Sequence, residues 1–245
     1  MKRLLSILTA MVLWMNGTAQ VAPDNDAILE HTIDSSSPYY YPALKLRYDR
    51  GDTTLTAEDY RHLYYGYAYR DEYRPLEEIP AEAELLMILE RNPEPDSAAC
   101  RDIIGKALEV MKADPFSPQN INFLTYAYTL LGDTTGARIN ARRLARIAET
   151  ITGSGSGLKI DSPWHVLRFQ HAADIIALRG LDIRKREVMN RTVEYVSLMQ
   201  KAPDNAKGYY FDFGRVYWKR PDTLPRTRTG GLQLNNYQII KGNKK

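Results

Sequence analysis

Glu58 and His62 are the two side chains of this sequence that are best placed for proton transfer. They are four residues apart in a segment with helical periodicity, so both face the same side of the expected helix. A histidine beside a carboxylate can act as a general acid or base. Such a pair is also an ordinary feature of helix surfaces, where it contributes roughly 0.2–0.5 kcal/mol. We favour the ordinary pair, because tyrosine hydroxyls but no evident nucleophile occur near His62.

The other residues capable of chemistry lack the spacing that a catalytic or metal site requires. The histidines have no metal-like spacing with another His, Cys or Glu on one expected helix; they are His31, His62, His165 and His171. Ser156 and Lys159 have the spacing of a serine–lysine acyl-transfer motif, but flanking glycines disfavour the helix that this motif needs. Residues 153–157 lack the G-x-G-x-x-G pattern and follow a helix, which indicates a linker rather than a phosphate-binding loop. We therefore predict no catalytic, cofactor-binding or metal-binding residues, and no cofactor.

Cys100 is the single cysteine of the chain, which excludes an internal disulfide bond. It could act as a nucleophile or form a bridge to another chain. Its segment, residues 97–103, has the pattern of the first turns of a helix. We therefore expect a small buried side chain.

Tyrosine is unusually frequent, with seventeen tyrosines against five phenylalanines. The tyrosines are densest between residues 39 and 73, and one expected helix carries three of them with Leu63 on a single face; these are Tyr60, Tyr64 and Tyr67. This stripe predicts packing between helices, with Tyr64 as a core residue. Tyr65, Tyr69 and Tyr73 lie off the stripe and cannot all be buried by the same contact, so they are the candidates for an exposed partner-binding surface, although core packing is the favoured interpretation of the tyrosine block.

Arg138, Arg142 and Arg146 recur every four residues and form a basic stripe along one expected helix. The stripe is either a solvated face or a surface for an acidic partner, and we include these arginines among the candidate partner-binding residues. The net charge of +3 gives no general attraction to nucleic acid or anionic membranes. We therefore predict a protein or peptide partner and no nucleic acid.

The first residues have the three-part layout of a secretory signal peptide. Lys2 and Arg3 form the basic start, residues 4–15 are apolar, and Gly17 and Ala19 occupy the positions that signal peptidase accepts. The apolar run is shorter than the ~20 residues of a membrane-spanning helix. No cysteine lies near the expected cleavage site, so the segment lacks the residue that a lipoprotein signal requires. We expect residues 1–19 to be cleaved, and the mature protein from Gln20 to be periplasmic or secreted, without membrane insertion.

The mature chain is expected to begin with a flexible leader, residues 20–37, which contains at most a short helix near residues 27–31. Residues 38–152 have helical periodicity, interrupted by turns rich in proline and glycine. One helix is expected to start at Thr56, where Asp59 completes a capping-box pattern.

Part of this helical region has tetratricopeptide-like spacing. The matching positions, where small residues let two helices approach, are Leu124, Tyr128, Gly132 and Ala137. Thr125 and Ala141 depart from the pattern, and a single degenerate unit is present. We therefore describe residues 38–152 as a helical tetratricopeptide-like region.

Residues 158–218 are predicted to form a small α+β region. Strands are expected over residues 164–169, 192–200 and 207–218, with a helix over residues 172–179. The segment 192–200 could instead be helical, but the neighbouring hairpin partner favours a strand. In the last strand Tyr209, Phe211 and Phe213 alternate with less apolar residues, which indicates a sheet with one apolar face. Residues 219–245 form a basic tail that we expect to follow the surface or be disordered. The predicted fold class is α+β, with the helical half packed against a small antiparallel sheet and one or two helices.

Several motifs occur in a distinctive order along the mature chain. The tyrosine-rich half contributes residues 37–42, 51–56 and 59–67, and the second half contributes the glycine-serine run and residues 164–167, 179–181 and 208–212. This order resembles a secreted family catalogued as domain of unknown function 4919. The resemblance implies an extracytoplasmic protein of Bacteroidetes-type bacteria and brings no activity, because none is assigned to the family. The basic tail departs from the family pattern.

Our leading hypothesis is an exported, non-catalytic binding or scaffolding protein that recognises a protein or peptide partner on a helical surface. The alternative is an envelope hydrolase with a His/carboxylate site between the two halves, for which His62, Glu58 and Asp212 are the candidates. An enzyme requires acid, base and nucleophile within hydrogen-bond reach in one cleft. The two hypotheses therefore differ in whether these side chains converge.

Overall fold

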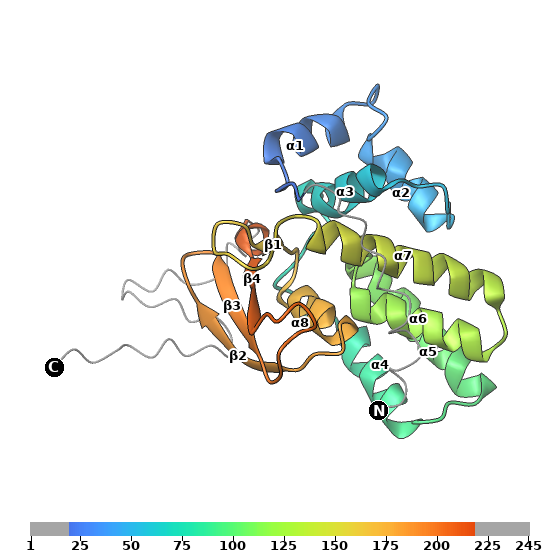
Figure 1. The fold of residues 1–245 in the computed structure, drawn as a ribbon. Coiled ribbons are helices and arrows are strands. Elements are labelled where there is room, and N and C mark those ends of the chain that lie inside the picture. The colour runs from blue at the N-terminus through green and yellow to red at the C-terminus, as the bar shows by residue number, and fades with distance from the viewer. Residues whose placement is uncertain (1–19, 219–245) are drawn as a thin grey trace, which may run out of the picture.

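The computed structural model describes residues 20–218, so the predicted signal peptide (1–19) and basic tail (219–245) lie outside the described residues. Three groups of elements make up the fold (Figure 1): three N-terminal helices, a stack of four longer helices, and a small sheet with one helix beside it. Within residues 20–218 none of the helices combines the length and apolar character needed to cross a membrane. The predicted α+β class is confirmed.

The N-terminal group contains α1 (Asn25–Ile33), α2 (Tyr41–Asp49) and α3 (Ala57–Gly66). The short helix expected near residues 27–31 is present as α1, which is longer than expected and capped, and its Ile28 and Thr32 are buried against α3. Gly66 permits this approach, since a Cβ atom there would lie 2.8 Å from the Thr32 side chain. The sequence pattern missed this docking because α1 buries so few apolar residues.

The capping box predicted at Thr56 is confirmed, and it begins α3, the most buried helix of the N-terminal group. In Figure 1, α1 and α2 lie on one side of α3, while α7 (Thr134–Thr152) lies on the other. A 3₁₀ turn, Tyr67–Tyr69, follows directly. Because α3 has neighbours on several sides, most of its residues are buried.

The four longer helices pack consecutively: α4 (Pro80–Arg91), α5 (Ser97–Ala113), α6 (Pro118–Leu130) and α7. The first three of them, α4, α5 and α6, enclose a small core of their own, in which Cys100 is 1 % exposed, as predicted. A Cβ atom at Gly136 would lie 2.8 Å from the Tyr128 ring, so this glycine allows α6 and α7 to approach closely. This consecutive packing agrees with the expected helical region, and the name tetratricopeptide-like remains a prediction.

Residues 153–157 do not form the predicted linker. Ser154 and Gly155 are buried, and a Cβ atom at Gly155 would lie 2.2 Å from the carbonyl oxygen of Pro163. Gly157 has a φ of +67° and packs against the indole of Trp164, while its carbonyl accepts a hydrogen bond from the Tyr210 N–H at 2.7 Å. The glycines are therefore required by tight packing, and the segment joins the helices to the sheet within one continuous core.

The sheet has the strand order β1-β4-β3-β2. The predicted strands at residues 192–200 and 207–218 correspond to β3 (Val193–Leu198) and β4 (Gly208–Asp212), which pair antiparallel. The expectation of a purely antiparallel sheet is wrong, because the short strand β1 (Trp164–His165) pairs parallel with β4. β1 ends early because the chain turns into α8 (Phe169–Leu178), which lies between the sheet and α6 (Figure 1).

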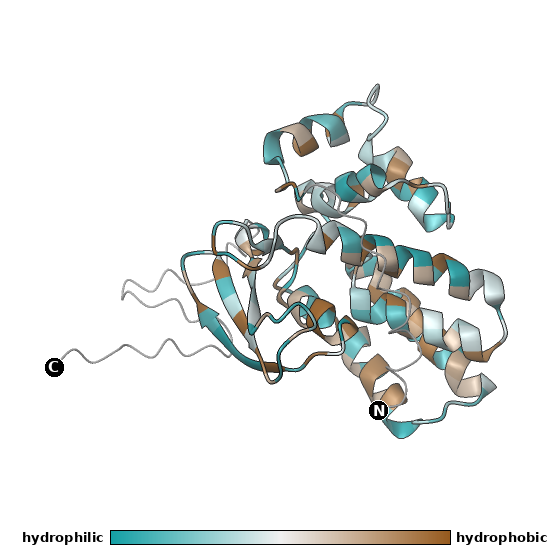
Figure 2. Ribbon diagram, viewed as in Figure 1, coloured by the Kyte–Doolittle hydropathy of each residue, from teal (hydrophilic) through white to brown (hydrophobic). Residues whose placement is uncertain are grey.

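Strand β2 (Ile183–Val188) was not predicted. Its sequence is dominated by charged residues, and it is mostly teal in Figure 2. Charged side chains are typical of an edge strand, because they prevent it from pairing with another chain. After β4 the chain ends its described part in a 3₁₀ turn, Gly214–Tyr217, rather than continuing as the expected strand.

Candidate functional site

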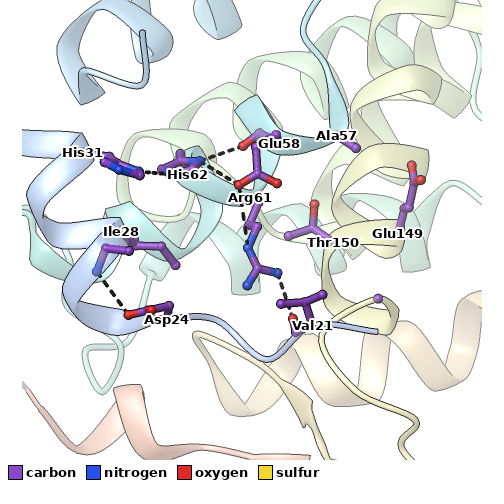
Figure 3. Close-up of a pocket in the computed structure, with 12 residues that line it drawn as sticks. Val21, Asp24, Ile28, His31, Ala57, Glu58, Arg61, His62, Glu149 and Thr150 are labelled. Atoms are coloured by element: carbon purple, nitrogen blue, oxygen red, sulfur yellow. Dashed lines mark hydrogen bonds and ion pairs between the residues drawn. The ribbon is translucent and has the colours of Figure 1, made fainter. Parts of the chain in front are cut away.

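A cavity of about 410 Å³ lies where the N-terminal segment, α3 and the end of α7 meet. Figure 3 shows its lining residues, with α1 on one wall and Glu149 and Thr150 of α7 on the other. The predicted pair of Glu58 and His62 lies here, joined by residues that the sequence did not connect to it. The full lining consists of Val21, Asp24, Ala27, Ile28, His31, Ala57, Glu58, Arg61, His62, Glu149, Thr150 and Gly153.

His31 and His62 are directly bonded, with Nδ1 of His31 at 3.0 Å from Nε2 of His62 (Figure 3). Nδ1 of His62 is 3.0 Å from the carbonyl oxygen of Glu58, which can only accept a hydrogen bond. The neutral His62 ring must therefore carry its hydrogen on Nδ1 and accept at Nε2. His31 is consequently the donor of the bond between the two rings, and it links α1 to α3.

The His62 ring is held in place by stacking as well as by hydrogen bonds. Tyr39 stacks on it with ring centroids 3.9 Å apart and an interplanar angle of 4°. The residue is 3 % exposed, and burial lowers the pKa of His62 despite the nearby carboxylate of Glu58. The neutral ring is thus the form that the folded state favours.

Acidification is expected to destabilise the fold through this pair. Because the folded-state pKa of His62 is below its ordinary value of 6.5, the stability that depends on the neutral ring is complete above that value and is lost as the pH falls. The urea unfolding midpoint should be lower at about pH 5 than at about pH 7.5. His62→Gln, which cannot gain a charge, should reduce the difference, and an undiminished difference would contradict this account.

The remaining polar groups of the cavity are engaged with their neighbours. Arg61 donates to the carbonyl oxygens of Val21 and Ala22 at 2.9 and 2.7 Å, which holds the N-terminal segment in place. Glu58 lies 3.4 Å from His62 and 3.9 Å from Arg61. The Thr150 hydroxyl donates to the Arg146 carbonyl at 2.8 Å. The cavity therefore offers fixed charges and hydrogen-bonding groups rather than an activated hydroxyl.

Asp212, the third candidate of the hydrolase hypothesis, belongs to a different group of side chains. Its carboxylate accepts from the Gly214 N–H at 2.6 Å and the Thr192 hydroxyl at 3.2 Å, and lies 3.9 Å from His165. It is not among the residues that line the cavity of His62. Burial lowers the pKa of His165 to about 4, so this imidazole is neutral over the ordinary range of pH.

A third group, fully buried, joins the N-terminal helices to the second half. The Tyr64 hydroxyl lies 2.8 Å from Nδ1 of His171, and Nε2 of His171 lies 2.9 Å from the Asp114 carboxylate. Arg168 approaches the same carboxylate at 3.4 Å. This Tyr–His–Asp chain has the connectivity of a proton relay, but its members are at most 5 % exposed, so it serves packing. No local signal in the sequence links these residues.

Asp174 lies near this group and accepts from the Gln119 N–H and the Gln170 amide. It is 3 % exposed, and burial raises its pKa to about 6. Its bonds tie α8 to the first turn of α6, which makes it a structural carboxylate.

The predicted tyrosine surface is wrong for Tyr65 and Tyr73, which are both buried in the core. The Tyr65 hydroxyl donates to the carbonyls of Thr150 and His165, and the Tyr73 hydroxyl donates to that of Leu167 at 2.6 Å. Tyr69 is half-buried and donates to the Asn25 carbonyl at 2.7 Å. Tyr65 is buried although it lies off the stripe because α3 contacts neighbours on several sides, and the favoured interpretation of core packing holds for Tyr65 and Tyr73.

The arginine stripe runs along α7 as predicted, with Arg138 exposed and Arg142 and Arg146 half-buried. Arg146 forms an ion pair with Glu149, in which Nη1 lies 2.6 Å from Oε2. Arg143, next to the stripe, points into the core instead, where its guanidinium lies 4.5 Å from the Tyr48 ring centre.

A scan against family models matches residues 26–220 to the domain of unknown function DUF4919. The searches of curated proteins and of solved structures give no match.

Proposed function

We propose a binding function for this chain, which belongs to the DUF4919 family of domains of unknown function. In this proposal it is an exported, non-catalytic protein that recognises a protein or peptide partner, and the cavity between α1, α3 and α7 receives part of that partner. Export is proposed from the signal-peptide layout of residues 1–19, and the cavity would then face the periplasm or the medium.

One observation carries the proposal: the cavity is large enough for a side chain, yet its reactive groups are engaged. It has a volume of about 410 Å³, and the single hydroxyl side chain in its lining, that of Thr150, donates to the main chain. The imidazole of His62 is likewise bonded at both nitrogens. Concave sites of this kind recognise ligands with a few fixed polar groups.

Filling the cavity is expected to abolish recognition. Ala57 lines the cavity, is exposed and lies in the first turn of α3, so Ala57→Trp should occupy the opening without removing a contact. Ala43→Trp, at an exposed position of α2 outside this lining, is the matched control. We expect a partner captured from envelope extract by the processed protein to be retained by the control and reduced at least about tenfold by Ala57→Trp, a loss of 1.4 kcal/mol or more.

Quantitative mass spectrometry of the captured proteins measures this difference. If no captured protein depends on Ala57, the cavity is not the recognition site. The hydrolase remains the alternative, and hydrolysis of an envelope substrate that His62→Ala abolishes in a folded protein would favour it instead.

A further inference from the structure

Helix α1 forms one wall of the cavity between α1, α3 and α7, and it is bonded to the rest of the fold at its two ends (Figure 3). Of its nine residues only Ile28 and Thr32 are buried. A helix of this length is marginal in water by itself, and one that buries so few side chains gains little from packing. The position of α1 therefore depends on the bonds at its ends.

The N-terminal end of α1 is held by groups that do not titrate near neutral pH. The Asn25 carbonyl accepts a hydrogen bond from the Tyr69 hydroxyl at 2.7 Å, and the Asn25 side-chain oxygen accepts one from Arg215. Arg61 donates to two main-chain carbonyls of the segment that precedes the helix. Amide, phenol and guanidinium groups keep their protonation state in mild acid, so this end stays anchored.

The C-terminal end of α1 is held by a bond that does depend on pH. His31, in the last turn of α1, bonds through Nδ1 to Nε2 of His62 on α3, with the two nitrogens 3.0 Å apart. His31 is exposed, so it can take up a proton from solvent. Histidine is the side chain that ordinarily changes its charge between about pH 5 and 8. The two ends of α1 therefore differ in their response to acid.

The His31–His62 pair can hold one added proton without losing its bond. In the neutral pair, His31 donates through Nδ1 and His62 accepts at Nε2. A proton on Nε2 of His31 leaves this donor in place, so the bond persists. A second proton must go to Nε2 of His62, and two N–H groups then face each other across 3.0 Å. The second proton therefore converts an attractive contact into a repulsive one.

The groups that face His62 act on its charge in both directions. The Glu58 carboxylate lies 3.4 Å from Nδ1 and favours a charged ring, whereas His31 and Arg61 disfavour it. Tyr39 stacks on the ring and contributes no charge. Burial is the largest effect and lowers the pKa of His62. When α1 moves away the ring gains water and its pKa rises toward the ordinary value, so release of the helix takes up a proton.

The remaining charges near the pair do not oppose this release. Asp24 and Asp34 cap the two ends of α1 itself, so their attraction to a charged His31 remains when the helix moves. Glu149, on the α7 wall of the cavity, is paired with Arg146 at 2.6 Å. These carboxylates therefore do not hold α1 on α3 once both rings are charged.

We propose that α1 is a lid over this cavity, which the His31–His62 pair holds closed near neutral pH and releases when both rings are protonated. The helix then turns about its anchored N-terminal end, and the wall that carries Ile28 and His31 leaves α3. The lid opens while the other helices stay folded, which distinguishes it from the acid sensitivity of the whole fold. The inference rests on the proposed function for one consequence, the release of a bound partner in acid.

Hydrogen–deuterium exchange of the processed protein, followed by mass spectrometry, measures the opening of single helices. We expect the protection of α1, corrected for the intrinsic effect of pH on exchange, to fall at least about tenfold between about pH 7.5 and about pH 4.5. At the lower pH α1 should exchange while α6, which does not line the cavity, remains protected. An unaltered protection of α1, or exchange of α1 and α6 together, would overturn the inference.

Three variants separate protonation from the mere loss of a contact. His62→Gln offers an amide oxygen in place of Nε2 and accepts from His31 at every pH, so the protection of α1 should change no more than about twofold. Glu58→Gln removes the carboxylate that favours a charged His62, so the fall should move to lower pH. His165→Gln, at a histidine outside the cavity lining, is the matched control and should leave the fall unchanged. An undiminished fall in His62→Gln would contradict the lid.

The exchange measurement needs no partner, so its failure leaves the proposed function standing. A partner whose capture depends on Ala57 should elute from the original protein at about pH 4.5. A partner that is retained at this pH would overturn the lid, whereas failure to capture any partner concerns the proposed function alone.

Discussion

Replacement of Tyr64 by alanine is expected to lower the free energy of unfolding by about 3–5 kcal/mol. The ring is 0 % exposed and packs against Tyr65 and Phe116, with ring centroids 5.0 and 5.9 Å apart. The substitution removes a large side chain from the centre of a core that the helices and the sheet share. Urea denaturation of the two proteins at one pH measures the difference.

Tyr64→Phe separates packing from hydrogen bonding in this prediction. It keeps the ring but leaves the Leu167 N–H and Nδ1 of His171 without the hydroxyl that now satisfies them. We expect a smaller loss, about 1–3 kcal/mol. A midpoint for Tyr64→Ala close to that of the original protein would contradict the burial described for this ring.

Removal of the Asp114 carboxylate should have a comparable effect, about 3–5 kcal/mol, for an electrostatic reason. Burial acts to raise the pKa of Asp114, but His171 and Arg168 outweigh it and keep the pKa below its ordinary value. In Asp114→Ala, Arg168 loses its carboxylate partner and Nε2 of His171 loses its acceptor. A buried charge without its partner is strongly destabilising, although the intact pair contributes little.

The control for Asp114→Ala is an exposed ion pair. Lys106 contacts Glu84 and Glu109 at 2.7 and 2.9 Å on the surface, so Lys106→Ala should change the unfolding midpoint little. Similar losses for Lys106→Ala and Asp114→Ala would show that burial does not set the size of the effect.

The sequence allowed the elements with local signals to be predicted. The capping box at Thr56, the helices bounded by prolines, and the alternation at Tyr209 and Phe211 each depend on residues close together in the chain. Elements that depend on distant partners were missed or misjudged. Helix α1 is stable because it docks on α3, and β2 exists because β3 lies beside it.

The same distinction holds for the candidate site. Glu58 and His62 could be paired from their spacing, because one helix places them together. The carbonyl of Glu58 that fixes the tautomer of His62 is also close in the chain, but the ring that donates to its Nε2 is that of His31, which is 31 residues away. The glycine-serine run shows a related limit. Its composition suits a flexible linker, but position 155 must be glycine because the carbonyl oxygen of Pro163 leaves no room for a Cβ atom. The composition of a segment indicates how flexible it can be, but it does not indicate which residues pack against it in the fold.

The hydrogen bonds of Asn25 have a consequence for the order of events during synthesis. Its main-chain carbonyl accepts from Tyr69, but its side-chain oxygen accepts from Arg215, 190 residues later. At about 5–20 residues per second, Arg215 leaves the ribosome roughly 10–40 s after Asn25. The nascent chain therefore spends that interval without this contact, and the hydrogen bonds of Asn25 are complete only when the last described turn arrives. A chain that stops before Arg215 would lack this bond between the two ends of the described chain.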